Sequence, residues 1–85
     1  MRVRVPSPLE DYTRAREVQA AGDTVDAVLH DLDRRFPGMR FRMVDEQQRV
    51  RAHIRLYVNR EPVTQLSAAL RSGDELLIVA ALSGG

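Results

Sequence analysis

One stretch of this chain has the spacing of an amphipathic helix, and it most limits the folds that are open to 85 residues. Its apolar side chains recur at helical intervals, at Val25, Val28, Leu29, Leu32 and Phe36. The hydroxyl of Thr24 can accept a hydrogen bond from a free amide of the first turn, and Pro37-Gly38 ends the pattern. The sequence therefore predicts one main helix over residues 25–36.

Two segments before this helix alternate between apolar and polar residues, as half-buried strands do. Residues 2–5 alternate Arg with Val, and Pro6 and Pro8 close the segment. Residues 13–20 alternate more weakly and predict a second strand, after a turn at residues 8–12. A pair of strands is therefore expected ahead of the helix.

The residues that follow the helix predict a loop and then a strand. Residues 39–52 show no regular period, which predicts an irregular loop held by a few apolar anchors: Phe41, Met43, Val44 and Val50. Residues 53–58 alternate strictly, with Ile54, Leu56 and Val58 expected to face inward.

The last third of the chain predicts two more strands. Residues 59–62 predict a turn, after which Val63 begins a short edge strand. Leu66 and Leu70 are one helical turn apart and predict a short helical turn. Residues 75–81 are almost entirely apolar, as expected of a strand inside a sheet.

Composition excludes several classes of protein. The chain has no Cys, which excludes disulfides, cysteine metal sites and cysteine nucleophiles. Its 44% hydrophobic content is typical of a single folded domain. No apolar run approaches the length of about 20 residues that spans a membrane, and the N-terminus does not read as a signal peptide, so we expect a cytoplasmic protein. The net charge of +1 does not favour general attraction to nucleic acid.

The sequence ends in Gly84-Gly85, preceded by Leu82-Ser83. Because glycine has no side chain, two terminal glycines can enter a narrow channel and present an unhindered carboxylate to another enzyme. Four extended residues span at most about 14 Å, enough to reach an active site while the folded body stays outside. The competing interpretation is a frayed end without function.

Four short motifs occur in a characteristic order: Gly22-Asp23-Thr24 before the helix, Tyr57-Val58-Asn59 at the end of a strand, Gly73-Asp74-Glu75 before the last strand, and Ser83-Gly84-Gly85. Together they resemble the ubiquitin-like sulfur-carrier family, which includes the small subunit of molybdopterin synthase and the carriers of thiazole and cysteine synthesis. The resemblance covers almost the whole chain. The long segment between residues 39 and 53 is most similar to the cysteine-synthesis carriers, whereas Ala80-Ala81 departs from the Pro that molybdopterin members often carry there.

The resemblance implies an α+β protein with the ubiquitin-like β-grasp fold, a mixed sheet of four to five strands packed on one main helix. Residues 1–81 would form this domain and residues 82–85 a flexible C-terminal diglycine tail. The family also implies a sulfur carrier, which is a protein co-substrate and not an enzyme. An E1-like enzyme would use ATP to adenylate the carboxylate of Gly85 and convert it to a thiocarboxylate. A cysteine-synthase-like enzyme or the large subunit of molybdopterin synthase would accept the sulfur, and the carrier itself would bind no cofactor.

The need for activation follows from elementary chemistry. A terminal carboxylate has a pKa near ~3.5, so at neutral pH it is an anion that repels nucleophiles and offers no leaving group. Adenylation supplies an electrophilic carbon and a leaving phosphate. Gly84 and Gly85 would present the reacting group, while Leu82 could occupy an apolar groove of the partner and Ser83 could hydrogen-bond the backbone of its channel.

A docking face is expected next to the tail, since four residues are too few for specific recognition. If alternate residues of the last strand face the helix, Leu77 and Val79 face outward, beside Val63 and Tyr57. An exposed apolar patch of this kind commonly marks a partner site. The alternative is that residues 39–50 cover it.

The remaining polar patterns are weaker. His30 and His53 have no Cys or close carboxylate motif beside them, so no metal site is expected. Asp31 and Asp33 point apart on a helix and do not form a catalytic pair. Residues 34–60 hold eight Arg against two acidic residues, which is typical of a solvated surface; a patch for an acidic partner or for RNA is the alternative.

Two other functions stay open from the sequence. Gly85 could form an isopeptide bond to a Lys of another protein, as in a ubiquitin-like modifier, or the chain could be a plain β-grasp interaction module. All thirteen basic residues are Arg, so the N-terminal amine is the only primary amine that this chain itself offers to an activated C-terminus.

Overall fold

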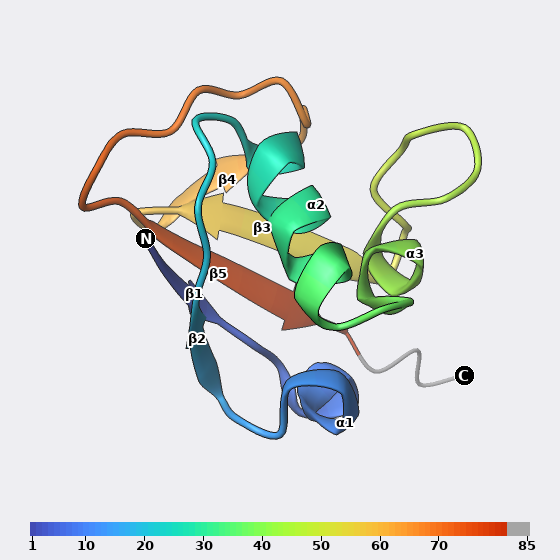
Figure 1. Cartoon of the computed structure of the whole chain (residues 1–85). Helices are drawn as coiled ribbons and strands as arrows, with labels where there is room; N and C mark the ends of the chain where they lie inside the picture. The colour runs from blue at the N-terminus through green and yellow to red at the C-terminus, as the bar shows by residue number, and fades with distance from the viewer. Residues whose placement is uncertain (82–85) are drawn as a thin grey trace.

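A five-stranded sheet and one long helix form the framework of the computed structural model, which describes residues 1–81 (Figure 1). The strands are β1 (Arg2–Arg4), β2 (Glu17–Gln19), β3 (Ile54–Val58), β4 (Glu61–Val63) and β5 (Glu75–Ala80). They lie in the order β2-β1-β5-β3-β4, with β1 and β5 parallel and all other neighbours antiparallel. The helix α2 (Val25–Arg35) crosses one face of this sheet. The mixed sheet on one main helix that the sequence predicts is confirmed.

The core fills the space between α2 and the face of the sheet that α2 covers. The helix contributes four buried side chains, those of Val25, Val28, Leu29 and Leu32. The strands contribute alternate residues, among them Val3, Ile54, Leu56, Leu76 and Ile78. Because β5 lies between β1 and β3 at the centre of the sheet, its side chains are covered on both flanks, which explains its apolar sequence.

Thr24 caps α2 as the sequence predicts. Its Oγ1 accepts a hydrogen bond from the amide of Ala27 at 3.1 Å, and its backbone is extended. Such a cap satisfies one of the amides that the first turn leaves without an intrahelical partner.

The segment of residues 64–70 satisfies two more of these amides. The carbonyl oxygens of Leu66 and Ala68 accept hydrogen bonds of 2.9 and 3.0 Å from the first two amides of α2. The segment runs past the start of α2 and contains a tight turn at residues 66–67, but no helical residues of its own. The short helical turn expected from Leu66 to Leu70 is therefore wrong. Leu70 is nevertheless buried, because pairing with the helix start holds it against the core.

Residues 39–52 are more ordered than the loop expected from the sequence. They begin with a short helix, α3 (Met39–Met43), and Val44 then forms a single β-bridge with Val50. Met39 and Met43 are fully buried one helical turn apart, whereas Phe41, expected to be an anchor, is 55% exposed. The carboxylate of Asp33 stabilises the start of this helix by accepting the amides of Gly38 and Arg40, both at 3.1 Å.

The segment between β1 and β2 also folds into helical turns instead of a plain turn. A 3-10 turn (Ser7–Leu9) leads directly into α1 (Glu10–Thr13), which ends at Arg14 with a positive φ of 57°. β2 is consequently shorter than expected and covers only Glu17–Gln19 of the alternating residues 13–20.

Gly22 is required by a close approach of two backbone segments. A Cβ atom at this position would lie 2.7 Å from the amide nitrogen of Val28 and 2.9 Å from the carbonyl carbon of Ala27. We therefore expect Gly22→Ala to lower the free energy of unfolding by about 1–3 kcal/mol, because the backbone of α2 must shift.

Urea unfolding followed by circular dichroism measures this effect. Ala21→Gly is the matched control, since it changes the neighbouring exposed position without adding an atom. Equal stability of Gly22→Ala and the unchanged protein would show that the start of α2 can move freely.

Candidate functional site

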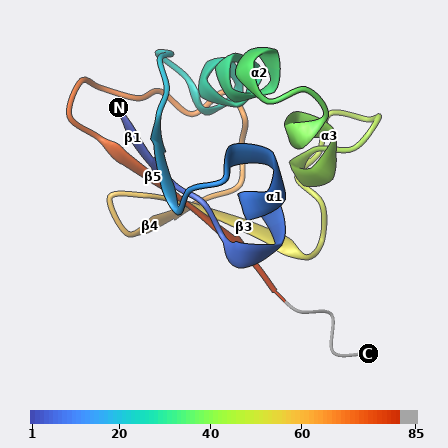
Figure 2. The ribbon, with the colours of Figure 1, turned by 60° about the horizontal axis from the view of Figure 1, so that its bottom comes forward.

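The end of β5 fixes the point from which the C-terminal residues leave the folded body. Ala80 pairs with Ile54 at the start of β3, and the amide of Ala81 still donates to the carbonyl oxygen of His53 at 2.7 Å. α1 and α3 both lie at this end of the sheet (Figure 2). The residues with a predicted role in the tail, Leu82, Ser83, Gly84 and Gly85, lie outside the described residues.

The N-terminal amine lies at the opposite end of the sheet. Because β1 and β5 are parallel, Arg2 pairs with Glu75 at the start of β5, and the amine of Met1 donates to the carbonyl oxygen of Ala20 at 2.8 Å. Six residues of β5 extend over about 20 Å, whereas four residues beyond Ala81 span at most about 14 Å. The amine of Met1 is therefore farther from Ala81 than four extended residues can span.

Two of the sequence motifs are joined by hydrogen bonds at that opposite end. The side-chain amide of Asn59 donates to Asp74 at 2.8 Å, and its oxygen accepts the amide of Glu75 at 3.0 Å. The second carboxylate oxygen of Asp74 accepts the amide of Arg71 at 2.7 Å. The Arg71 amide, followed by the Asn59 side chain, lowers the pKa of Asp74 below its ordinary value. This cluster sets where β5 begins relative to β3, and hence where β5 ends.

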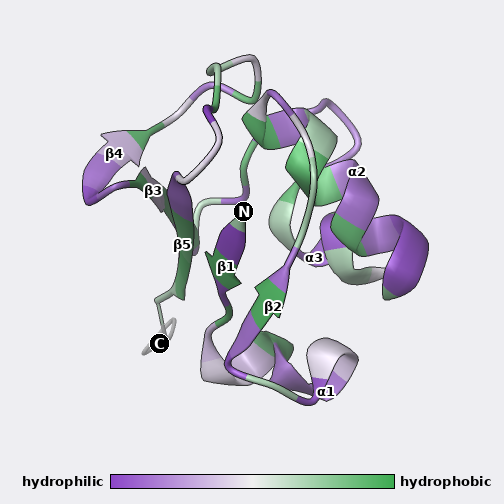
Figure 3. Ribbon diagram, turned by 60° about the vertical axis from the view of Figure 1, so that its left-hand side comes forward, coloured by the Kyte–Doolittle hydropathy of each residue, from purple (hydrophilic) through white to green (hydrophobic). Residues whose placement is uncertain are grey.

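Three of the four residues predicted for a docking patch lie together on the face of the sheet that α2 leaves open. Tyr57 pairs with Leu77, and Val79 pairs with Arg55 on the same face. All three apolar side chains are half-buried. In Figure 3, β5 is hydrophilic at its start and hydrophobic through the rest of its length. We call Tyr57, Leu77 and Val79 the outer patch.

Val63, the fourth predicted residue, lies on the other face. It pairs with Leu56 and packs against the core, so placing it beside Leu77 and Val79 is wrong. The turn between β3 and β4 has two residues, Asn59 and Arg60, with positive φ of 50° and 73°. Such a two-residue turn pairs Val58 with Glu61, which puts Pro62 opposite Tyr57 and turns Val63 inward. The signal was present in the sequence, because the length of a hairpin turn sets the register of its strands.

Residues 39–50 do not cover the outer patch. Met39 and Met43 belong to the core on the helix side of the sheet, and α3 contacts α2. The segment therefore lies on the opposite side of the sheet from Leu77 and Val79.

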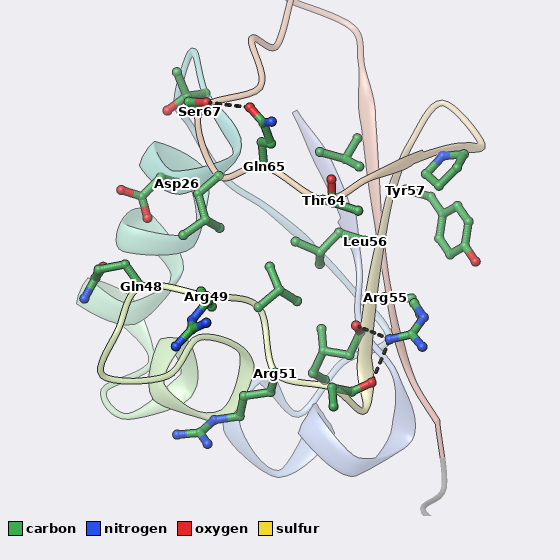
Figure 4. A pocket seen from close by; sticks show the side chains of 17 residues that line it. Asp26, Gln48, Arg49, Arg51, Arg55, Leu56, Tyr57, Thr64, Gln65 and Ser67 are labelled. Carbon is green, nitrogen blue, oxygen red and sulfur yellow. Dashed lines mark hydrogen bonds between the residues drawn. The ribbon is translucent and has the colours of Figure 1, made fainter.

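A pocket of about 990 Å³ opens on the helix side, between β3, β4, the loop before β3 and the start of α2 (Figure 4). Apolar side chains, including Val50, Leu56, Val63 and Leu66, line part of it. Its one carboxylate, from Asp26, is paired with Arg40 at 2.7 Å. These side chains suit binding, and they include no nucleophile paired with a base.

The histidines and the paired aspartates lie apart and have separate structural surroundings. His30 is close to Asp26, at 3.3 Å, while His53 lies at the tail end of the sheet. Asp31 accepts the amide of Ala21 at 2.9 Å, which together with Arg34 and Arg35 lowers the pKa of its carboxyl, and Asp33 caps α3. Within residues 1–81, no three His, Asp or Glu side chains are placed to hold a metal ion.

A second pocket, of about 430 Å³, lies against Ala80 and Ala81. Tyr12 of α1, Arg42 of α3 and His53 line it. Arg42 donates from Nε to the Tyr12 hydroxyl at 2.8 Å, which joins α3 to α1 across the pocket. Tyr12 and Arg42 were not expected to lie together, because thirty positions separate them and no local pattern connects them.

Comparison with known proteins identifies the fold and the family. The sequence profile of the ThiS family matches residues 3–85. The sulfur carrier protein CysO of Mycobacterium tuberculosis strain H37Rv is 34% identical over 89 residues, which cover 98% of this chain and 96% of that protein. In the described part of this chain, no helix is both long and apolar enough to cross a membrane.

Solved structures with the same fold include two kinds of protein. A chain of the Amycolatopsis orientalis BexX/CysO complex has a TM-score of 0.91 at 34% identity, covering 99% of this chain and 98% of that one. M. tuberculosis CysO has a TM-score of 0.89 at 31% identity, covering 95% and 98%. SAMP1 of Haloferax volcanii has a TM-score of 0.80 at 28% identity, covering 100% and 98%.

Proposed function

Because this chain belongs to the ThiS family of ubiquitin-like sulfur carriers, of the cysteine-synthesis type, we propose that it carries sulfur as a thiocarboxylate on Gly85. The observation that carries the proposal is the position of the C-terminus. Ala80 and Ala81, the last described residues before it, lie at the end of the central strand that is opposite the N-terminal amine, and the sequence closes four residues later with two glycines. An acyl group activated there can be used by a partner but not by the carrier's own amine.

The chemistry takes place in two steps on an E1-like partner. The Gly85 carboxylate attacks the α-phosphorus of ATP, and pyrophosphate leaves, which gives an acyl-adenylate. A sulfide or persulfide sulfur then attacks the acyl carbon, and AMP leaves with the electron pair of the broken carbon–oxygen bond. If the donor is a persulfide, the first product is an acyl disulfide; a thiolate of the partner then attacks the donor-side sulfur, a new disulfide forms between thiolate and donor, and the thiocarboxylate leaves. The carrier contributes the carboxylate and its position, and ATP binds to the partner.

A cysteine-synthase-like enzyme is the acceptor class that we propose, rather than the large subunit of molybdopterin synthase. Support comes from the CysO relatives and from the long segment between residues 39 and 53, which contains α3. The length of this segment is most similar to that of the cysteine-synthesis carriers. The A. orientalis structure holds a CysO with BexX, so carriers of this type do form complexes with second proteins. We propose that the activating and accepting enzymes dock on the outer patch.

The function as a protein modifier is the second candidate. It is favoured by the similarity to SAMP1, since the same protein from H. volcanii is described as small archaeal modifier protein 1. In that role the acyl-adenylate passes to a Lys of a target protein and not to sulfur.

Mass spectrometry of the intact chain, purified from its own cells, distinguishes these functions. Replacement of one oxygen by sulfur at Gly85 is expected for the carrier, whereas adducts joined through Gly85 to other proteins are expected for the modifier. Incubation with ATP and the E1-like enzyme of the same organism should raise the thiocarboxylate fraction. A chain that stays unmodified under these conditions would contradict both functions and leave an interaction module.

A further inference from the structure

The eight arginines of residues 34–60 fall into groups with different surroundings, although the sequence presents them as one basic run. Arg34 and Arg35 pair with Asp31, and Arg40 pairs with Asp26. In these three the positive charge is compensated on the surface of α2. The pair of Arg40 with Asp26 joins α3 to α2, and all three pairs leave little charge for a partner.

Three other arginines are held by neutral oxygen atoms. Arg42 donates to the Tyr12 hydroxyl at 2.8 Å, Arg51 to the carbonyl oxygen of Phe41 at 2.7 Å, and Arg55 to that of Ala52 at 2.6 Å. Within residues 1–81, none of these three guanidinium groups makes an ion pair with a carboxylate. Their side chains are held in place, and in the described residues none of the three is directly paired with a carboxylate.

Asp45 is the acidic residue closest along the chain to this group, and it is engaged elsewhere. Its Oδ1 accepts the amides of Gln47 and Arg49 at 2.9 and 3.0 Å. These amides, together with the charges of Arg49 and Arg51, lower the pKa of Asp45, but its carboxylate serves mainly to close its own loop.

An exposed aromatic ring lies among these arginines. Phe41 is 55% exposed, and the guanidinium of Arg51 is stacked over its ring at 4.6 Å from the centroid. Stacking and the hydrogen bond to the Phe41 carbonyl hold the two side chains together. Rigid aromatic and arginine side chains of this kind are enriched at the centres of protein interfaces.

Arg42 and Arg55 lie next to the last residues of β5, and the backbone of Arg51 is one turn away from them. Arg42 lines the pocket beside Ala80 and Ala81, and Arg55 lies opposite Val79. The carbonyl oxygen of Arg51 accepts the amide of Ile54, which is itself paired with Ala80. Asp11 is the one carboxylate among the residues that line this pocket.

An enzyme that takes up the tail must contact this region. Four residues span at most about 14 Å, so the mouth of the partner's channel lies within that distance of Ala81. Positive charges that have no directly paired carboxylate attract negative charge and repel positive charge at such a contact. The partner's surface at this contact is therefore expected to carry negative charge.

We propose that one surface of this chain docks against a ring of Asp and Glu side chains around the mouth of the partner's channel that receives the tail. We call it the tail-root surface, and it consists of Tyr12, Phe41, Arg42, Arg51 and Arg55. The inference rests on the proposed function, since it requires a partner that takes up the C-terminus. Phe41 inserts between the acidic side chains as an apolar anchor, and the three arginines pair with them. A protein partner is favoured over RNA because the net charge is only +1 and the surface offers one exposed Phe ring, not a row of aromatic rings for stacked bases.

Steady-state adenylation tests the proposal with the E1-like enzyme of the same organism, MgATP and the full chain. For the double variant Arg42→Gln/Arg51→Gln we expect the KM for the carrier to rise about tenfold or more, with kcat unchanged, because docking and not chemistry is weakened. Raising the ionic strength from low salt should raise the KM of the unchanged carrier and affect the double variant less.

Two matched variants separate charge from structure. Arg42→Lys/Arg51→Lys keeps both charges and should recover most of the lost affinity. Arg60→Gln removes one charge from the turn at the far end of β3 and should leave KM unchanged. Thermal unfolding of each variant verifies that the fold is retained.

The outcomes distinguish the two proposals. If the unchanged carrier is not adenylated, the proposed function fails and the inference fails with it. If it is adenylated and the double Gln variant has the same KM, only the inference is overturned. The unchanged carrier could also bind bulk tRNA and the double Gln variant could lose that binding while its KM for adenylation stays the same. This result would assign the tail-root surface to nucleic acid and would also overturn the inference.

Discussion

Deletion of Gly85 is expected to lower thiocarboxylate formation by at least about 100-fold while leaving the free energy of unfolding unchanged. The deletion moves the terminal carboxylate back by one residue, about 3.5 Å, along the channel of the activating enzyme. A displacement of even about 1 Å in a reacting group can cost about 100-fold in rate, because the attack on ATP depends on alignment. The fold should not respond, since the last strand of the sheet ends at Ala80.

Mass spectrometry after incubation with ATP, a sulfur donor and the E1-like enzyme measures this loss, and urea unfolding measures stability. Gly85→Ala is the matched control, because it keeps the length of the chain and adds one methyl group beside the carboxylate. If activation is sensitive to the added methyl group, thiocarboxylate formation falls in Gly85→Ala. A loss caused by the shorter chain is seen only in the deletion variant. Normal thiocarboxylate formation by the shortened chain would contradict a role of Gly85 as the activated residue.

The second large effect is expected from Val79→Asp on the outer patch. A carboxylate at this position would have to lose water when a partner covers the patch, and we expect activation and sulfur transfer to fall about tenfold to 100-fold. Folding should be retained, because Val79 is only half-buried and Arg55 lies directly opposite as a partner for the new charge.

Gln19→Asp provides the control for charge on the same face. Gln19 lies on β2, at the far edge of the sheet from Val79, and is exposed. Comparing kcat/KM of the two variants with the E1-like enzyme and with the sulfur-accepting synthase separates a local effect from a general one. If Val79→Asp folds and is activated and used as efficiently as Gln19→Asp, the outer patch is not the docking face.

Features that depend on neighbouring residues could be predicted from the sequence. Thr24 caps α2 because a hydroxyl just before an apolar helical pattern has a free amide within reach, and Ala27 supplies it. Ile54 and Leu56 point inward because side chains alternate along any strand. The position of Leu77 and Val79 on one face follows from the same rule.

Features that depend on how segments meet were missed or wrong. Val63 faces the core because a two-residue turn sets its register with Leu56. Met39 and Met43 belong to a short helix whose first amides are held by Asp33, a residue of the preceding helix. The segment of residues 64–70 forms a turn and not a helix because its carbonyl groups accept the first amides of α2, a need that its own sequence does not reveal.

The main helix, the apolar strand before the tail, the diglycine end and the family motifs could all be read from the amino-acid sequence. These are properties of spacing and of local chemistry, which each segment carries wherever it packs. In contrast, the contact of Asn59 with Asp74 at one end of the sheet and that of Arg42 with Tyr12 at the other became visible only in the folded chain. A side-chain hydrogen bond between distant positions depends on strand register and helix packing, so it is established only when the whole chain has folded.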